Sequence, residues 1–67
     1  MSQFAERLKE LREEKGVSIQ KLSKEVHIGA ASLCRWENKQ ADVKGEQLIS
    51  LARYFDVSVD YLLGLTD

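Results

Sequence analysis

The chain has 67 residues, enough for one small domain with a modest core, and we expect residues 1–67 to form a single domain. Its one cysteine excludes an intramolecular disulfide, and no apolar run approaches the roughly 18 residues of a membrane span. The formal net charge of −1 weighs against a nucleic-acid binder, because that class is more often basic.

The first predicted helix covers residues 3–15. Phe4, Leu8 and Leu11 recur on one face at helical spacing, and Gly16 follows as a natural C-terminal stop. The N-terminal segment MSQFAERLKE has no apolar core of the kind that a signal peptide contains. We therefore expect a cytoplasmic protein in a reducing compartment, of bacterial or phage origin.

Four further helices share one starting device, the hydrophobic staple, in which an apolar residue before the helix has an apolar partner five positions later. The pairs are Val17 with Leu22, Ile28 with Leu33, Val43 with Leu48, and Val57 with Leu62. The N-caps are then Ser18, Gly29, Lys44 and Ser58, of which Lys44 is a poor capping residue. The predicted helices are 19–26, 30–38, 45–55 and 59–63, and the predicted fold class is all-α.

These registers also predict the core. Its members are apolar residues at helical spacing, namely Phe4, Leu8, Leu11, Leu22, Val26, Ile28, Leu33, Trp36, Leu48, Leu51, Ala52, Phe55, Val57 and Leu62. Trp36 differs from the others because its indole N–H requires a hydrogen-bond partner or an exposed edge.

The stretch VSIQKLSKEVHIGAASLCRWEN, residues 17–38, reads as two short helices joined by a tight turn at residues 27–29. That spacing is typical of a helix-turn-helix, in which the second helix reads base edges and the first contacts phosphates. The positive charge is concentrated here, since residues 17–40 carry four basic and two acidic side chains, whereas residues 41–67 carry two basic and five acidic ones. The excess is small, so we expect weak non-specific affinity for DNA and a shallow salt dependence.

Four segments in the right order, FAERLKELREEKG, LSKEV, SLCRWEN and LISLARYFDVSVDYLLG, resemble the Cro/phage-repressor (XRE) type of helix-turn-helix regulator. The resemblance runs from Phe4 to Gly64. It implies a five-helix lambda-repressor-like DNA-binding domain with residues 30–38 as the recognition helix. The implied function is a sequence-specific transcriptional regulator, most often a repressor, that reads a palindromic operator.

The resemblance also implies site residues. Gly29 and the expected base contacts Ala30, Ala31, Ser32 and Arg35 lie at or near the groove-facing positions. Arg35 is the main candidate for base reading because its guanidinium can donate two hydrogen bonds to guanine O6 and N7; the alternative is an arginine that faces solvent or a phosphate. The expected phosphate contacts lie at the edges of the motif and are Ser18, Gln20, Lys21, Asn38, Lys39 and Lys44.

By the same resemblance, Arg12 and Glu37 form a buried ion pair that joins the first and third helices. The chain departs from the family pattern at Ile19, where a glutamine is common, and at His27, where a glycine is usual. A left-handed conformation at His27 costs more than at glycine. Ser23, at the position of a customary small residue, still agrees with the pattern.

The family typically binds two-fold operators as a dimer. We expect a weak homodimer that is strengthened on DNA. Its expected interface consists of residues that are apolar beyond the needs of the core, namely Val59, Tyr61, Leu63 and Leu65. An alternative function is a protein-interaction module, antitoxin-like or anti-regulator, on the same fold. The acidic C-terminal third and the alanine-rich groove face keep that alternative open.

We expect no enzymatic activity, cofactor or metal, because the sequence contains no activated nucleophile, phosphate loop or clustered metal ligands. We also expect no membrane partner, and no small-molecule ligand is evident. His27 and Cys34 are too few for a zinc site. For Cys34, the sequence favours a small, partly buried thiol over a redox switch.

Overall fold

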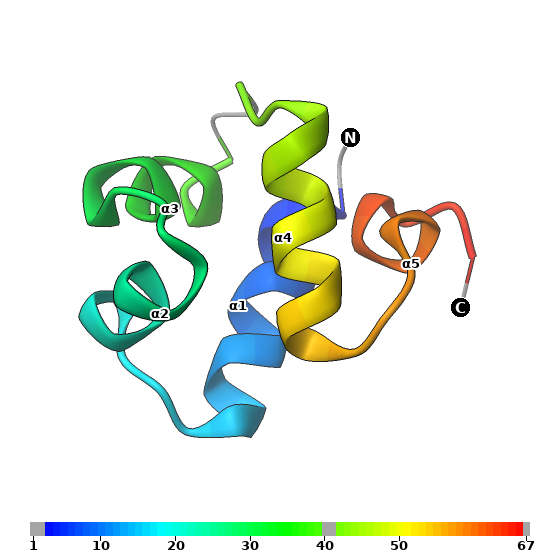
Figure 1. The fold of residues 1–67 in the computed structure, drawn as a ribbon. Helices are drawn as coiled ribbons and strands as arrows, with labels where there is room; N and C mark the ends of the chain where they lie inside the picture. The colour runs from blue at the N-terminus through cyan, green and yellow to red at the C-terminus, as the bar shows by residue number, and fades with distance from the viewer. Residues whose placement is uncertain (1–2, 40–41, 67) are drawn as a thin grey trace.

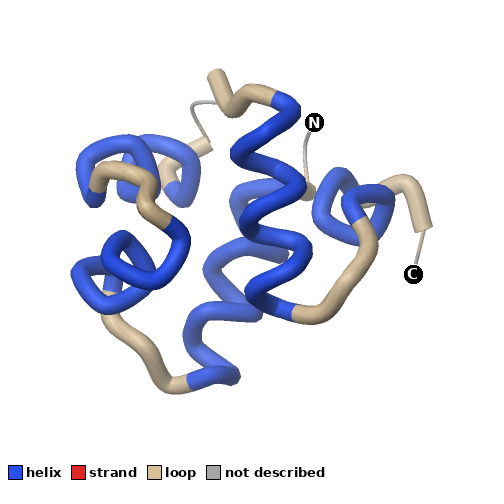
Figure 2. Tube along the Cα trace, in the orientation of Figure 1, coloured by secondary structure: helices blue, strands red, loops and turns tan. Residues whose placement is uncertain are grey.

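The computed structural model describes residues 3–39 and 42–66, and all regular secondary structure in these residues is helical. Five helices follow one another, α1 (Phe4–Lys15), α2 (Ile19–Val26), α3 (Ala30–Glu37), α4 (Gly45–Phe55) and α5 (Val59–Leu63) (Figures 1 and 2). The all-α class is confirmed, and each helix boundary lies within one residue of its predicted position. No helix in the described ranges is long and apolar enough to cross a membrane.

The helices begin where the capping residues predict. The Ser18 and Ser58 hydroxyl oxygens each accept a hydrogen bond from the backbone N–H three residues later, at 3.0 Å in both cases. Lys44 makes no such bond with its side chain, as expected for a poor cap. Gln47 compensates, because its Oε1 accepts a hydrogen bond from the Lys44 N–H at 2.8 Å.

Left-handed residues end four of the helices. Gly16 (φ 73°) and Gly64 (φ 78°) tolerate this backbone, whereas His27 (φ 58°) and Asp56 (φ 56°) adopt it despite their side chains. Gly64 has a second constraint, since a Cβ there would lie 2.8 Å from the Cβ of Gln3.

The helices pack around one core. In Figure 1, α2 and α3 lie on one side of α4, α5 lies on the other side, and α1 lies behind α4. Contacts join α1 to α3 and α5, α2 to α3 and α4, and α4 to α5. The helix-turn-helix pair therefore rests on α1 and α4, which together act as its scaffold.

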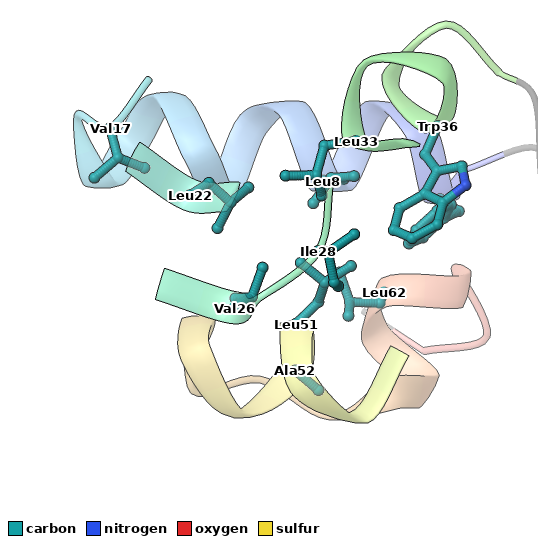
Figure 3. Packing of buried hydrophobic residues seen from close by; sticks show 11 residues of the cluster. Leu8, Val17, Leu22, Val26, Ile28, Leu33, Trp36, Leu51, Ala52 and Leu62 are labelled. Atoms are coloured by element: carbon teal, nitrogen blue, oxygen red, sulfur yellow. The ribbon is translucent and has the colours of Figure 1, made fainter. Parts of the chain in front are cut away.

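Most of the predicted core residues are buried, two buried residues were not predicted, and four predicted ones lie at the edge of the core. The side chains that are almost fully buried come from all five helices and are Phe4, Leu8, Leu22, Leu33, Trp36, Leu51 and Leu62 (Figure 3). Ala5 and Val17 are also buried, although the predicted core omitted them. Leu11, Leu48, Phe55 and Val57 are only partly buried and pack against the edge of this cluster.

Candidate nucleic-acid interface

The turn between α2 and α3 is held by the core and by one side chain. Ile28 is buried, and its carbonyl oxygen accepts a hydrogen bond from the Ser23 hydroxyl at 2.6 Å. His27 supplies the left-handed residue that the chain reversal requires. The Ser23 hydroxyl thus ties α2 to the turn that follows it.

One side of α3 faces the core and the other faces solvent. Leu33 and Trp36 are buried (Figure 3), whereas Ala31, Cys34, Arg35 and Asn38 are exposed. Spacings of three and four residues place these four on one side of the helix, which we call the outer face of α3. Ala30 and Ser32 are partly buried and flank it. Cys34 and Asn38 were not among the predicted base contacts, although the same helical spacing would have found them.

Cys34 corrects an expectation, because its thiol is exposed rather than partly buried. It lies between Ala31 and Arg35 on the outer face of α3, one turn before Asn38. The Asn38 amide donates to the Cys34 carbonyl oxygen at 2.9 Å and lies 3.7 Å from the sulfur. Among residues 3–39 and 42–66, no group of three or more potential ligands could hold a metal ion.

Arg35 forms an ion pair that was not predicted. Its Nη2 lies 2.8 Å from the Oδ2 of Asp42, with side chains 43% and 60% exposed. The other Asp42 oxygen accepts a hydrogen bond from the Trp36 indole at 2.6 Å, so the expected partner of the indole exists. These bonds from Trp36 and Arg35 lower the pKa of Asp42.

The predicted phosphate-contact residues are all exposed. Ser18, Gln20 and Lys21 lie at the start of α2, where free backbone N–H groups and the helix dipole favour an anion. Lys39 follows α3 with a left-handed backbone (φ 71°), and its Nζ lies 3.6 Å from Glu6. Lys44 is the N-cap of α4.

The expected ion pair between α1 and α3 is present. Arg12 donates to both Glu37 carboxylate oxygens, at 2.7 and 3.2 Å, and to the Val17 carbonyl oxygen at 3.0 Å. The two side chains are 16% and 10% exposed, so the pair is partly buried and not fully buried as expected. The bond to Glu37 raises the pKa of Arg12. This pair fixes the orientation of α3 on its scaffold.

The last helix exposes less apolar surface than expected. Val59 packs against the core, which corrects its assignment to surface beyond the needs of the core. The Arg7 guanidinium lies 4.2 Å from the centre of the Tyr61 ring and donates to the carbonyl oxygens of Tyr61 and Thr66. Leu63 is partly buried, and Leu65 is 72% exposed.

Comparison with known proteins agrees with this geometry. A family model described as "Helix-turn-helix domain" matches residues 5–67. Over 64 residues the chain is 36% identical to YobD of Bacillus subtilis (strain 168), which is named as an uncharacterized HTH-type transcriptional regulator. The aligned region covers 96% of this chain and 57% of YobD. It is 34% identical over 61 residues to the HTH-type transcriptional regulator ImmR of the same organism, covering 91% of this chain and 48% of ImmR.

A third relative is the HTH-type transcriptional activator BcrR of Enterococcus faecalis, at 26% identity over 91% of this chain and 30% of BcrR. No solved structure gives a significant match. The chain spans about half the length of the first two relatives. The match to the family model and the identity to YobD and ImmR show that the chain belongs to the XRE-type helix-turn-helix regulators.

Proposed function

We propose that this domain binds double-stranded DNA by placing the outer face of α3 in the major groove. The observation that carries the proposal is the arrangement of α3, which is held to α1 by Arg12 and Glu37 and presents four exposed side chains on its opposite side. A B-DNA major groove is about 12 Å wide and admits one α-helix. The relatives named as transcriptional regulators support the same function.

Arg35 is the proposed base-reading residue. Only its Nη2 is bonded to Asp42, so other N–H groups of the guanidinium remain available to guanine O6 and N7. Ala31 can contact a thymine methyl, and Cys34 joins the predicted Ala30 and Ser32 as a neighbour of the bases. Such a surface reads few base pairs by hydrogen bonding, so apolar contact and DNA shape contribute to its preference.

Phosphate binding is proposed at the two edges of the outer face. Ser18, Gln20 and Lys21 serve one edge, together with the backbone N–H groups at the start of α2 that the Ser18 cap leaves free. Asn38, Lys39 and Lys44 serve the other edge. Because few cations take part, affinity should fall only shallowly with salt concentration.

We further propose a cytoplasmic repressor that acts as a weak homodimer on a palindromic operator, with residues 1–67 as its DNA-binding domain. Half-sites about 34–36 Å apart would place two copies of α3 in successive major grooves. The proposed dimer contacts are Tyr61, Leu63 and Leu65, without Val59. Sedimentation on a palindromic duplex tests the dimer, and one bound copy per duplex at saturation would contradict it.

The decisive experiment is selection of duplexes from a random pool at several salt concentrations, with wild type, Arg35→Ala and Arg53→Ala. Arg53 is an exposed arginine on α4, so its variant controls for the lost charge. We expect wild type and Arg53→Ala to enrich the same palindrome, and Arg35→Ala to relax it at one position in each half-site. Absence of enrichment at every salt concentration would refute DNA reading and leave the protein-interaction module as the alternative.

A further inference from the structure

Asp42 connects the core of the domain to its proposed base-reading residue. Each of its two carboxylate oxygens has its own donor, the Trp36 indole at 2.6 Å and the Arg35 guanidinium at 2.8 Å. The two donors are consecutive residues of α3, one pointing inward and the other outward. Asp42 itself precedes α4, so the carboxylate bridges α3 to the loop that follows it.

The bond to Trp36 fixes the position of the carboxylate. Trp36 is 1% exposed and packs at a ring-centre distance of 6.3 Å from Phe4, so its indole N–H has a set direction. An exposed ion pair usually contributes little, in part because two long side chains must be ordered in one geometry. Here the acceptor is already ordered by the core, and only the arginine has to be oriented.

The bond to Arg35 leaves the guanidinium able to read a base. A single nitrogen, Nη2, is engaged, and an arginine has further N–H groups in a fixed planar arrangement. An arginine held along one edge can therefore still offer two parallel donors to guanine. Its negative neighbour also reduces its attraction to phosphates, which carry no sequence information.

We propose that Asp42 is a specificity-determining residue, which positions Arg35 for one guanine and suppresses its use as a general phosphate contact. This inference rests on the proposed function, because it presumes that α3 enters the groove. Asp42 acts through Arg35 and is a positioning residue that need not touch DNA itself. A different role, in which Asp42 holds Arg35 away from DNA until the pair breaks, would have the opposite effect on specific affinity.

The test is Asp42→Asn, because the asparagine oxygen can still accept the Trp36 bond while the negative charge is lost. Binding is measured to three duplexes: the selected operator, the operator with the one base pair that Arg35→Ala relaxes replaced, and an unrelated sequence. We expect discrimination against the replaced base pair to fall by about tenfold. Affinity for the unrelated duplex should rise by roughly two- to threefold.

The matched control is Asp56→Asn, which makes the same change of charge at the left-handed C-cap of α4, where asparagine is also tolerated. It should leave discrimination unchanged. Thermal melts followed by circular dichroism verify that each variant is folded. In an Arg35→Ala background, Asp42→Asn should have no further effect on discrimination, which separates positioning from a merely structural role.

Three results would overturn the inference. If Asp42→Asn leaves the discrimination against the replaced base pair unchanged while Arg35→Ala still relaxes the site, the positioning role of Asp42 is refuted. The proposed function is then left intact. Tighter operator binding with discrimination preserved identifies the holding role instead. If wild type selects no sequence, the proposed function and this inference both fail.

Discussion

The two sides of α3 carry ion pairs of opposite character. On the scaffold side, Arg12 and Glu37 are 16% and 10% exposed and share two hydrogen bonds. On the outer side, Arg35 and Asp42 are 43% and 60% exposed and share one. The same chemistry therefore serves two purposes, holding the helix in place on one side and directing a reading side chain on the other.

The difference follows from the surroundings of each pair. A buried pair costs free energy to desolvate, so its net contribution is small, but loss of one partner leaves an uncompensated charge. An exposed pair is screened by water and salt, so its loss has little effect on folding. Stability experiments should therefore detect the scaffold pair, whereas DNA-binding experiments should detect the outer pair.

The largest expected effect is the loss of one scaffold partner. Arg12→Met should lower the free energy of unfolding by about 3 kcal/mol, the lower end of the range for a buried pair, because both side chains retain slight exposure. The double variant Arg12→Met, Glu37→Leu should be more stable than the single variant, because no unpaired carboxylate remains. Urea or thermal unfolding of the two variants measures this difference. Equal stability of wild type and Arg12→Met would show that the pair does not hold α3.

A smaller effect is expected at Lys39, two residues after the end of α3. Lys39 has φ 71°, and a left-handed backbone costs a residue with a side chain about 1–2 kcal/mol. Lys39→Gly should therefore raise the free energy of unfolding by about 0.5–1 kcal/mol, after allowance for the greater backbone entropy of glycine. The exposed contact of Lys39 with Glu6 is too weak to reverse the sign.

Lys24→Gly is the matched control for that prediction. Lys24 is an exposed lysine inside α2, so the same replacement there should destabilise the domain by about 1 kcal/mol. Opposite signs for the two variants would confirm strain at position 39. Destabilisation by both would show that the Lys39 side chain matters more than its backbone.

The fold could be predicted because its signals are local. Staple spacing, Ser18, Ser58 and Gly16 place the helix ends within one residue, and such features act over a few positions of the chain. Burial of Val17 was missed, although its pairing with Leu22 was identified and the corresponding staple residue Ile28 was assigned to the core. The partial exposure of Phe55 and Leu48 depends on how neighbouring helices cover them, which periodicity does not specify.

The candidate site was predicted less completely, for a different reason. The exposed face of α3 follows from its register, and the resemblance to the family singled out Arg35 on it. Asp42 gave no comparable signal, because an acidic residue in a loop is usually a solvated one, and its role depends on the loop returning toward Trp36. Val59 was misassigned because five-residue α5 presents too short a pattern to separate core from surface.

The smallest expected effect on stability belongs to the outer pair, and pH can isolate it. The bonds from Trp36 and Arg35 lower the pKa of Asp42 in the folded protein, so the carboxylate stabilises the fold above its unfolded pKa, about 4. That contribution is lost as the pH falls through the lower, folded pKa. The fluorescence of Trp36 should report the change directly, because protonation of Asp42 weakens the acceptor of the indole N–H.

An acid titration of Trp36 fluorescence should therefore show a transition with its midpoint below pH 4, before the domain unfolds by circular dichroism. Asp42→Asn should lack this transition, while Asp56→Asn should retain it, because Asp56 ends α4 and is no partner of the indole. High salt should move the midpoint upward by screening Arg35 from Asp42, whereas the scaffold pair, with its short hydrogen bonds and low exposure, should respond less. A salt-independent midpoint would mean that the Trp36 bond alone lowers the pKa of Asp42, and that Arg35 is free to leave the carboxylate at no measurable cost.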